Sequence, residues 1–349
     1  MSIVASLRLQ HVRSHQDYAV TFHDGVTVIT GPNGSGKTTI LEAIYIALQG
    51  TSFKSADAEV LRATGPWWRI DLVTVDGDKR AITYDPERVT KKKQFQIDQR
   101  TLARLVPKYK HPVVLFEPED LRLLNGSPAR RRQFIDRFIS QLNPLYATAL
   151  RKYERALKQR NTLLKRPYIA NDELFAWNIA LAEHGAYIIE QRIAFVEKIN
   201  SQLTDAYNDI AQSSDVVSMH YSHTFVGDIK QKLLDELHAR AERDRLLGNT
   251  SVGPHRHDVI FHLNEAPVLS TASRGETRTI VLALKFLEVA IIEQLTGLKP
   301  LILLDDVFSE LDEARQQALS RRTREHQIIM TSTHIVGSQR DFTHITLGD

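Results

Sequence analysis

Hydrophobic and polar residues alternate along the first hundred residues of the chain, and this pattern predicts β-strands. Residues 2–9 alternate in this way, and residues 70–75 and 80–84 flank an Asp76-Gly77 pair that favours a hairpin turn. A short apolar run at residues 113–116 predicts a buried strand that continues the same sheet. The first part of the chain is therefore expected to form an antiparallel sheet.

From Pro128 onward, apolar residues recur every three to four positions, which predicts helices. Phe134, Phe138 and Leu142 follow this spacing, and a second helical pattern covers residues 174–211. Pro167 and the polar residues 171–172 separate the two patterns. Since neither keeps strict heptads for long, we expect an amphipathic helical arm that goes out and returns, and not an extended coiled coil.

The pattern returns to strands at residues 253–261, and the last hundred residues look like the second half of the first domain. The chain is therefore predicted to have an α/β fold in which a helical lobe interrupts one head domain. The predicted bounds are 1–124 and 248–349 for the two parts of the head and 125–247 for the lobe.

Residues 31–38 read GPNGSGKT, which is a complete phosphate-loop motif between a predicted strand and a predicted helix. Gly34 and Gly36 lack the Cβ that would keep a phosphate away from the backbone, and Lys37 supplies a positive charge for the β and γ phosphates. A chance match is improbable with these flanks, so the chain is predicted to bind a nucleoside triphosphate. The residues expected to contact it are Gly31, Pro32, Asn33, Gly34, Ser35, Gly36, Lys37, Thr38 and Thr39.

A second apolar strand, residues 301–304, ends at Asp305 and Asp306, which is the form of a Walker B element. We expect the Thr38 hydroxyl and Asp305 to hold Mg²⁺, and Asp306 to polarise the attacking water. An ordinary acidic turn would look similar in isolation. Beside an intact phosphate loop, however, the catalytic interpretation is favoured.

A turn of small residues precedes the helical pattern of residues 280–295, so Ser273 and the Gly275 backbone are candidates for a second anion site. A plain helix N-cap would have the same appearance. Farther along, a strand at residues 328–333 ends at His334, which is a candidate contact for the γ phosphate. A single histidine at a strand end is more often structural.

The formal charge is only +3, but it is distributed unevenly. Residues 121–166 carry twelve basic side chains against two acidic ones, and such a run suits a phosphate backbone, although a solvated helix face is the ordinary alternative. The predicted DNA-binding residues are Arg130, Arg131, Arg132, Arg151, Lys152, Arg155 and Lys158. The chain has no cysteine and no apolar run of membrane-spanning length, so we expect a cytoplasmic protein without disulfides or a membrane partner.

The order of these elements resembles the ABC-type ATPases: phosphate loop, signature turn, Walker B strand, Ser309-Glu310-Leu311-Asp312, and a strand ending in histidine. The resemblance implies an ABC-type head, a P-loop NTPase with a mixed sheet. It also implies an ATP-dependent homodimer in which the phosphate loop of one subunit and the signature turn of the other enclose ATP. Ser309 and Asp312 would then lie at the dimer interface.

Several blocks further resemble the RecF family of bacterial recombination proteins. They cover nearly the whole chain in order: residues 22–45, 52–54, 116–121, 126–136, 253–258 and 273–279. This resemblance implies a weak, DNA-stimulated ATPase of recombinational and gap repair. Such a protein binds duplex DNA near junctions with single strands, and it works with RecO and RecR to help load RecA.

Four positions depart from the patterns of these groups. Arg274 and Glu276 replace the glycine and glutamine of the general signature, His257 stands where the family more often has an acidic residue, and Asp306 replaces a glutamate. The shorter Asp306 favours slow turnover. Two alternative functions remain at this point: the nucleotide-binding subunit of a transport ATPase, and a scaffold that ATP switches to recruit partner proteins.

Overall fold

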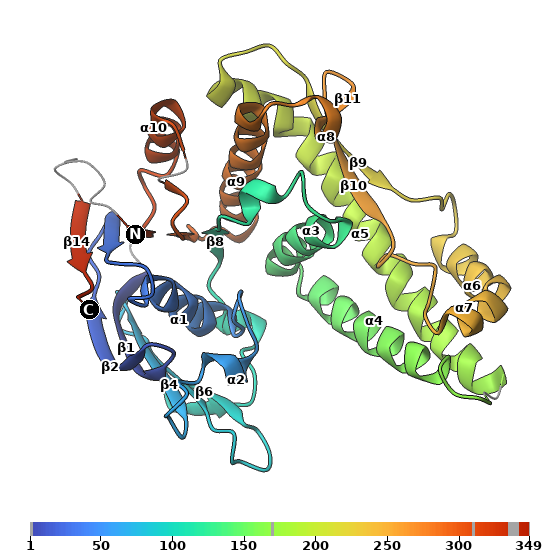
Figure 1. Cartoon of the computed structure of the whole chain (residues 1–349), viewed down its shortest axis with the longest axis horizontal. Coiled ribbons are helices and arrows are strands. Elements are labelled where there is room, and N and C mark those ends of the chain that lie inside the picture. Colours follow the sequence, from blue (N-terminus) through green and yellow to red (C-terminus); the bar gives the residue numbers. More distant parts are fainter. Residues whose placement is uncertain (1–2, 169–170, 309–310, 334–341, 349) are drawn as a thin grey trace. The chain divides into compact units, whose positions relative to one another are not determined.

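A computed structural model of the chain describes residues 3–168, 171–308, 311–333 and 342–348 (Figure 1). The chain divides into two compact units, which we call the head and the lobe. The head consists of Met1–Asp120 and Glu288–Asp349, and the lobe consists of Leu121–Leu287.

The head contains a six-stranded antiparallel sheet in the order β2-β1-β4-β5-β6-β7. Its strands are β1 (Val4–Val12), β2 (His15–Thr21), β4 (Trp68–Thr74), β5 (Lys79–Tyr84), β6 (Lys93–Ile97) and β7 (Arg100–Leu102). Strands β4 and β5 form the predicted hairpin, in which Val73 pairs with Lys79 around the Asp76-Gly77 turn. The alternation of the first hundred residues thus predicted this sheet correctly.

A second sheet of the head has five parallel strands in the order β14-β3-β13-β12-β8. These strands are β3 (Val26–Thr30), β8 (Val113–Phe116), β12 (Leu301–Leu304), β13 (Ile328–Ser332) and β14 (Phe342–Thr346). Strand β8 was expected to continue the antiparallel sheet, but it pairs with β12 instead. Its four residues are all buried, as is typical of a parallel strand covered on both faces.

Helix α1 (Lys37–Gln49) packs against strands of both sheets, as Figure 1 shows. Twelve of its thirteen residues are buried, including polar Glu42 and Gln49. A helix that is covered all round carries apolar side chains on every face, which explains the apolar run of residues 43–48. The smaller elements of the head are α2 (Asp57–Val60), η1 (Pro107–Tyr109), η2 (Asp120–Arg122, at the boundary with the lobe) and α10 (Glu313–Arg322).

The lobe is built on three helices, α3 (Pro128–Leu142), α4 (Pro144–Leu163) and α5 (Asn171–Ala211). Helices α4 and α5 lie side by side and form the predicted arm (Figure 1). Asn143 separates α3 from α4, and its side chain accepts hydrogen bonds from the backbone N–H groups of Leu145 and Tyr146, as an N-cap does. Helices α6 (Ile229–Ala239) and α7 (Ala241–Leu247) follow, and α6 packs on α5.

A three-stranded sheet also belongs to the lobe, in the order β11-β10-β9. Its strands are β9 (Val217–Ser222), β10 (Asp258–Leu263) and β11 (Ala266–Pro267), and α8 (Val268–Thr271) and α9 (Arg274–Thr296) follow them. We expected the head to resume at residue 248, but β10 pairs with β9 of the lobe, and the boundary lies within α9 at Leu287. The strand-like pattern of residues 253–261 corresponds to β10, but this strand belongs to the lobe and not, as we had expected, to the head.

Candidate phosphate site and basic surface

The predicted phosphate loop lies between the end of β3 and the start of α1. Gly36 has φ +93° and stands at the N-terminus of α1, so three or more backbone N–H groups of the first turn are available to an anion. A Cβ at Gly36 would lie 2.4 Å from both the Ser14 Oγ and the His15 Nε2. Only glycine combines this backbone angle with this close approach.

Lys37 is buried, and its Nζ donates hydrogen bonds to the carbonyl oxygens of Gly31 (2.8 Å) and Pro32 (3.0 Å). The ammonium group therefore lies over the loop, in the position from which it can reach a bound phosphate. A pocket of about 400 Å³ opens beside it. The predicted residues that line this pocket are Asn33, Gly34, Gly36, Lys37, Thr38, Thr39 and Asp306.

The two predicted metal ligands are in direct contact. Thr38 Oγ1 donates to Asp305 Oδ1 at 2.8 Å, and Thr331 Oγ1 donates to the same oxygen at 2.9 Å. Burial raises the pKa of Asp305, and the two hydroxyl donors oppose that rise. The site is therefore suited to a cation, which would favour the ionised carboxylate.

Asp306, the predicted catalytic carboxylate, follows directly in the left-handed region with φ +50°. Its backbone N–H donates to Thr331 Oγ1 at 2.9 Å, so one threonine bonds the Asp305 carboxylate and the backbone of Asp306. Because β12 and β13 are neighbouring parallel strands, their carboxyl ends bring Asp305, Asp306 and Thr331 together.

Three residues of the pocket wall were not predicted: Arg13, Ser14 and Lys54. Arg13 lies in the β1–β2 turn with φ +47°, and its guanidinium bonds Glu42 of α1 at 2.6 and 3.0 Å. Glu42 is 1% exposed and also accepts from Ser52, so it fixes two loops to the helix. A glutamate among the apolar residues of the phosphate-loop helix indicates that a partner exists, but it does not identify Arg13 as that partner.

A second pocket, of about 500 Å³, is lined by the same loop through Pro32 and Ser35 and by His15 and Tyr18. His15 is 9% exposed, stacks on Tyr18 at 4.9 Å, and donates through Nε2 to the Gly36 carbonyl at 3.2 Å. Burial lowers the pKa of His15, so the imidazole is neutral at pH 7 with its proton on Nε2. This contact braces the loop from the side of β2.

Ser273 and Gly275 belong to the lobe, at the start of α9. Ser273 Oγ accepts from the Glu276 N–H at 3.2 Å, and the Ser273 N–H donates to Glu276 Oε2 at 2.6 Å. This reciprocal pair is a capping box, a role that Glu276 fills at the position where the general signature has glutamine. The Ser273 hydroxyl oxygen accepts in this arrangement, so its proton can be donated to an anion.

The remaining predicted residues are His334, expected at the γ phosphate, and Ser309 and Asp312, expected at the dimer interface. His334 and Ser309 lie outside the described residues. Asp312 caps α10 by accepting from the Arg315 N–H at 3.0 Å.

Helix α4 presents most of the predicted basic residues to solvent. Arg151, Lys152, Arg155 and Lys158 are all exposed. The spacing of Arg151, Arg155 and Lys158 places these three cations on one face, along about 10 Å of the helix axis. We call these four residues the α4 stripe.

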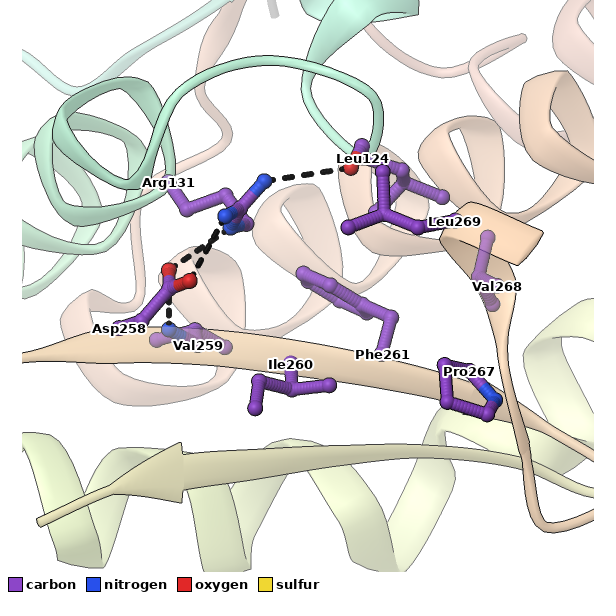
Figure 2. A pocket seen from close by; sticks show the side chains of 9 residues that line it. All are labelled: Leu124, Arg131, Asp258, Val259, Ile260, Phe261, Pro267, Val268 and Leu269. Carbon is purple, nitrogen blue, oxygen red and sulfur yellow. Dashed lines mark hydrogen bonds and ion pairs between the residues drawn. The ribbon is translucent and has the colours of Figure 1, made fainter.

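Arg131 was predicted to bind DNA, but the structure places its side chain inside the lobe, where it is 5% exposed. Figure 2 shows its guanidinium against Asp258 of β10, with N–O distances of 2.8 and 2.7 Å, and it also donates to the Leu124 carbonyl at 3.2 Å. Arg131 therefore has a structural role inside the lobe and is not part of the basic surface. Its neighbours Arg130 and Arg132 are half-buried, and Arg132 donates to the His257 carbonyl at 2.7 Å.

Replacing Arg131 by glutamine should lower the stability of the lobe without acting on DNA directly. Removing one partner of a buried ion pair costs about 3–5 kcal/mol, and we expect the lower end because Asp258 is partly exposed. The measurement is the midpoint of chemical denaturation. Arg155→Gln removes an exposed charge of the same kind and should leave the midpoint unchanged. An Arg131→Gln protein of normal stability would contradict the structural role.

Among the described residues, no helix is both long enough and apolar enough to span a membrane. A family model described as "AAA domain" matches residues 6–240. The chain is 33% identical to the "DNA replication and repair protein RecF" of Streptococcus equi subsp. zooepidemicus (strain H70), over 95% of this chain and 92% of that protein. It is also 33% identical to the protein of that name from Ruminiclostridium cellulolyticum, over 95% and 93%.

Two solved structures are also similar to this chain. A structure described as the "recombination mediator protein RecF-ATPrS in RecFOR pathway" has a TM-score of 0.87 and 28% identity, and covers 97% of this chain and 94% of its own. A structure of an SMC head bound to the C-winged helix domain of ScpA matches with a TM-score of 0.51 at 15% identity, over 95% of this chain and 90% of its own. The second likeness concerns the fold alone.

Proposed function

The chain belongs to the RecF family of DNA replication and repair proteins, and from this premise we propose that it is an ATP-dependent DNA-binding protein of recombinational and gap repair. Its fold is that of an ABC-type ATPase head split by a helical lobe. The observation that carries the proposal is the convergence of Lys37, Thr38, Asp305 and Asp306 at one end of the parallel sheet. Four residues from two distant segments meet there in the arrangement that phosphoryl transfer requires.

ATP would place its β and γ phosphates on the N-terminal backbone of α1, with Lys37 moving from the loop carbonyls to the phosphate oxygens. Arg13, Ser14 and Lys54 form the wall of the same pocket and would contact the rest of the nucleotide. The structure solved with an ATP analogue for a RecF protein supports this assignment by its similarity to the whole chain. Asp306 would accept the proton of the attacking water.

Thr38 and Asp305 suit Mg²⁺, because a hydroxyl oxygen and a buried carboxylate oxygen, both ligands that this ion prefers, already lie 2.8 Å apart. When bound, the ion would neutralise charge on the phosphates. Thr331 would keep Asp305 oriented through its 2.9 Å hydrogen bond.

The second half of the site would come from a second copy of the chain, through Ser273 and Gly275 of its signature turn. The capping box supports this, because the Ser273 hydroxyl oxygen accepts from the Glu276 N–H and the hydroxyl proton stays available to an anion. His334 would contact the γ phosphate, and Ser309 and Asp312 would lie at the dimer interface. Hydrolysis would be weak, since Asp306 is one methylene shorter than the usual glutamate, and family membership supports its stimulation by DNA.

Duplex DNA near a junction with single-stranded DNA is the proposed partner of the α4 stripe. Only Glu154 among the exposed residues 151–158 is acidic, so the stripe offers four cations to a phosphate backbone. Arg130 and Arg132 can add to it from α3. Family membership supports RecR as a further partner, with RecO and RecA in the same pathway, and a cytoplasmic location.

We expect DNA binding by the α4 stripe to depend steeply on salt. Four phosphate contacts predict that affinity falls about a hundredfold between 50 and 200 mM salt. Replacing all four residues of the stripe by glutamine should flatten the slope of log affinity against log salt by about three to four. Fluorescence anisotropy with a labelled duplex measures both quantities, and a salt-insensitive interaction would contradict the proposal.

The complete proposal is tested by sedimentation velocity with and without ATP, and with and without a duplex that carries a single-stranded tail. The wild-type chain should dimerise with ATP, and the tailed duplex should join the dimer. The stripe variant should dimerise but bind little DNA. A monomer under all conditions would exclude the composite site, and equal binding by both proteins would exclude the α4 stripe.

A further inference from the structure

A second concentration of positive charge lies in the head, at residues 79–110. This segment carries ten basic side chains against three acidic ones, whereas the whole chain has a net charge of only +3. It includes strands β5, β6 and β7 and the 3-10 turn η1. The α4 stripe is part of the lobe and does not account for it.

Two of these cations have structural roles. Arg80 donates to the carbonyl oxygens of Ala47 and Tyr109 at 3.3 and 2.7 Å, and Lys93 bonds the Gly50 carbonyl at 3.0 Å and Asp57 at 2.5 Å. Both neutralise the carbonyl end of α1, where the helix dipole favours positive charge. The remaining exposed cations of the segment are Lys79, Lys91, Lys92, Arg100, Arg104, Lys108 and Lys110.

Arg100 and Lys108 converge on one phenol group. The Lys108 Nζ lies 4.6 Å from the centre of the Tyr109 ring, and Arg100 Nη1 donates to the Tyr109 hydroxyl oxygen at 3.5 Å. Lys108 and then Arg100 lower the pKa of Tyr109. In the described part of the chain, neither cation has a carboxylate partner. Two positive charges thus lie beside one neutral phenol, and an anion bound between them would reduce the repulsion between the two cations.

We infer that Arg100, Lys108 and Tyr109 form a phosphate-binding surface of the head, and that it takes backbone phosphates of DNA. The two cations supply charge, and the phenol, whose oxygen accepts from Arg100, supplies an O–H donor. That these phosphates belong to DNA rests on the proposed function. The ordinary alternative is that cations protect β7, a three-residue strand at the open edge of its sheet, from pairing with other chains.

The first test replaces Arg100 and Lys108 together by glutamine and measures duplex binding by anisotropy between 50 and 200 mM KCl. We expect about tenfold weaker binding and a salt slope that is flatter by one to two, because two phosphate contacts are lost. Lys230→Gln with Lys232→Gln removes two exposed lysines of α6 and should leave both quantities near wild type. Wild-type affinity and slope in the Arg100/Lys108 variant would overturn the inference, even if the protein became less soluble.

A second test uses the absence of cysteine from the chain. Ala103→Cys, at an exposed position beside the cluster, gives one attachment point for a photoactivated crosslinker, and Ser214→Cys gives an exposed control in the lobe. DNA should crosslink at 103 and not at 214, and no crosslink at 103 would overturn the inference. Loss of binding in the α4 stripe variant is a separate outcome that concerns the proposed function. If the wild-type chain binds no duplex, both the proposed DNA-binding function and the phosphate-binding surface of the head are excluded.

Discussion

Replacing Lys37 by alanine should reduce ATP affinity by about a hundredfold or more. Hydrogen bonds to charged groups are each worth about 1.5–3 kcal/mol, and the ammonium group is placed to make one with the β phosphate and one with the γ phosphate. The variant should still fold, because the hydrogen bonds of the Lys37 side chain within the described residues go to the loop carbonyls of Gly31 and Pro32. Without ATP binding, the variant should remain a monomer.

The measurement for Lys37→Ala is the change in melting temperature with ATP. A ligand at a hundred times its dissociation constant stabilises the folded state by about 2.7 kcal/mol, so the wild-type chain should melt at a higher temperature with ATP and the variant should not. Lys54→Ala is the matched comparison, since Lys54 is an exposed cation that lines the same pocket, and its loss should weaken ATP binding less than the loss of the buried Lys37. An equal loss of the ATP effect in both variants would indicate general charge attraction and not a phosphate contact by Lys37.

The phosphate loop and the Walker B strand could be predicted from the sequence because their chemistry is local. Each consists of adjacent residues whose backbone conformation depends on glycine or on a strand end, as at Gly36 and Asp305. The wall of the pocket could not be predicted in the same way. Arg13 reaches it through a left-handed turn and a bond to Glu42, which is 29 residues away, and no local pattern records that contact.

The basic run shows the limit of charge counting. Arg131 and Arg160 contributed to its excess of positive charge, but each is buried against a carboxylate far along the chain, Asp258 and Asp244 respectively. Arg160 is completely buried and bonds Asp244 at 2.8 Å. Only basic residues on the solvent-exposed face of a helix remain available to DNA. Helical spacing alone does not tell the exposed face from the buried face when both carry arginine.

The lobe boundary was misplaced for a related reason. Strands β9 and β10 alternate buried and exposed residues as the strands of the head do, and alternation does not identify the partner strand. Among the described strands, β10 pairs with β9 on one side and β11 on the other, and the three form a small sheet inside the lobe. The signature turn consequently belongs to the lobe.

Replacing Asp306 by asparagine should separate ATP binding from hydrolysis. A positioned general base contributes about 10²–10⁴-fold to rate, so phosphate release should fall by that factor, while ATP affinity stays near wild type. Asparagine has the same size and tolerates the left-handed backbone at φ +50°. The backbone N–H of residue 306 can keep its 2.9 Å hydrogen bond to Thr331. The dimer formed with ATP should therefore persist longer than the wild-type dimer in sedimentation experiments.

Asp306→Ala provides the control for strain at this position. It also removes the carboxylate, but alanine in the left-handed region costs about 1 kcal/mol, so this variant should lose stability as well as hydrolysis. If the asparagine variant hydrolyses ATP at the wild-type rate, Asp306 is not the base. If it binds ATP, forms no lasting dimer and still associates with RecR to the same extent as wild type, the ATP-switched scaffold explains the chain better than the composite ATPase. If the dimer instead persists in the asparagine variant and opens in the wild-type protein, hydrolysis is the step that opens the dimer and releases DNA.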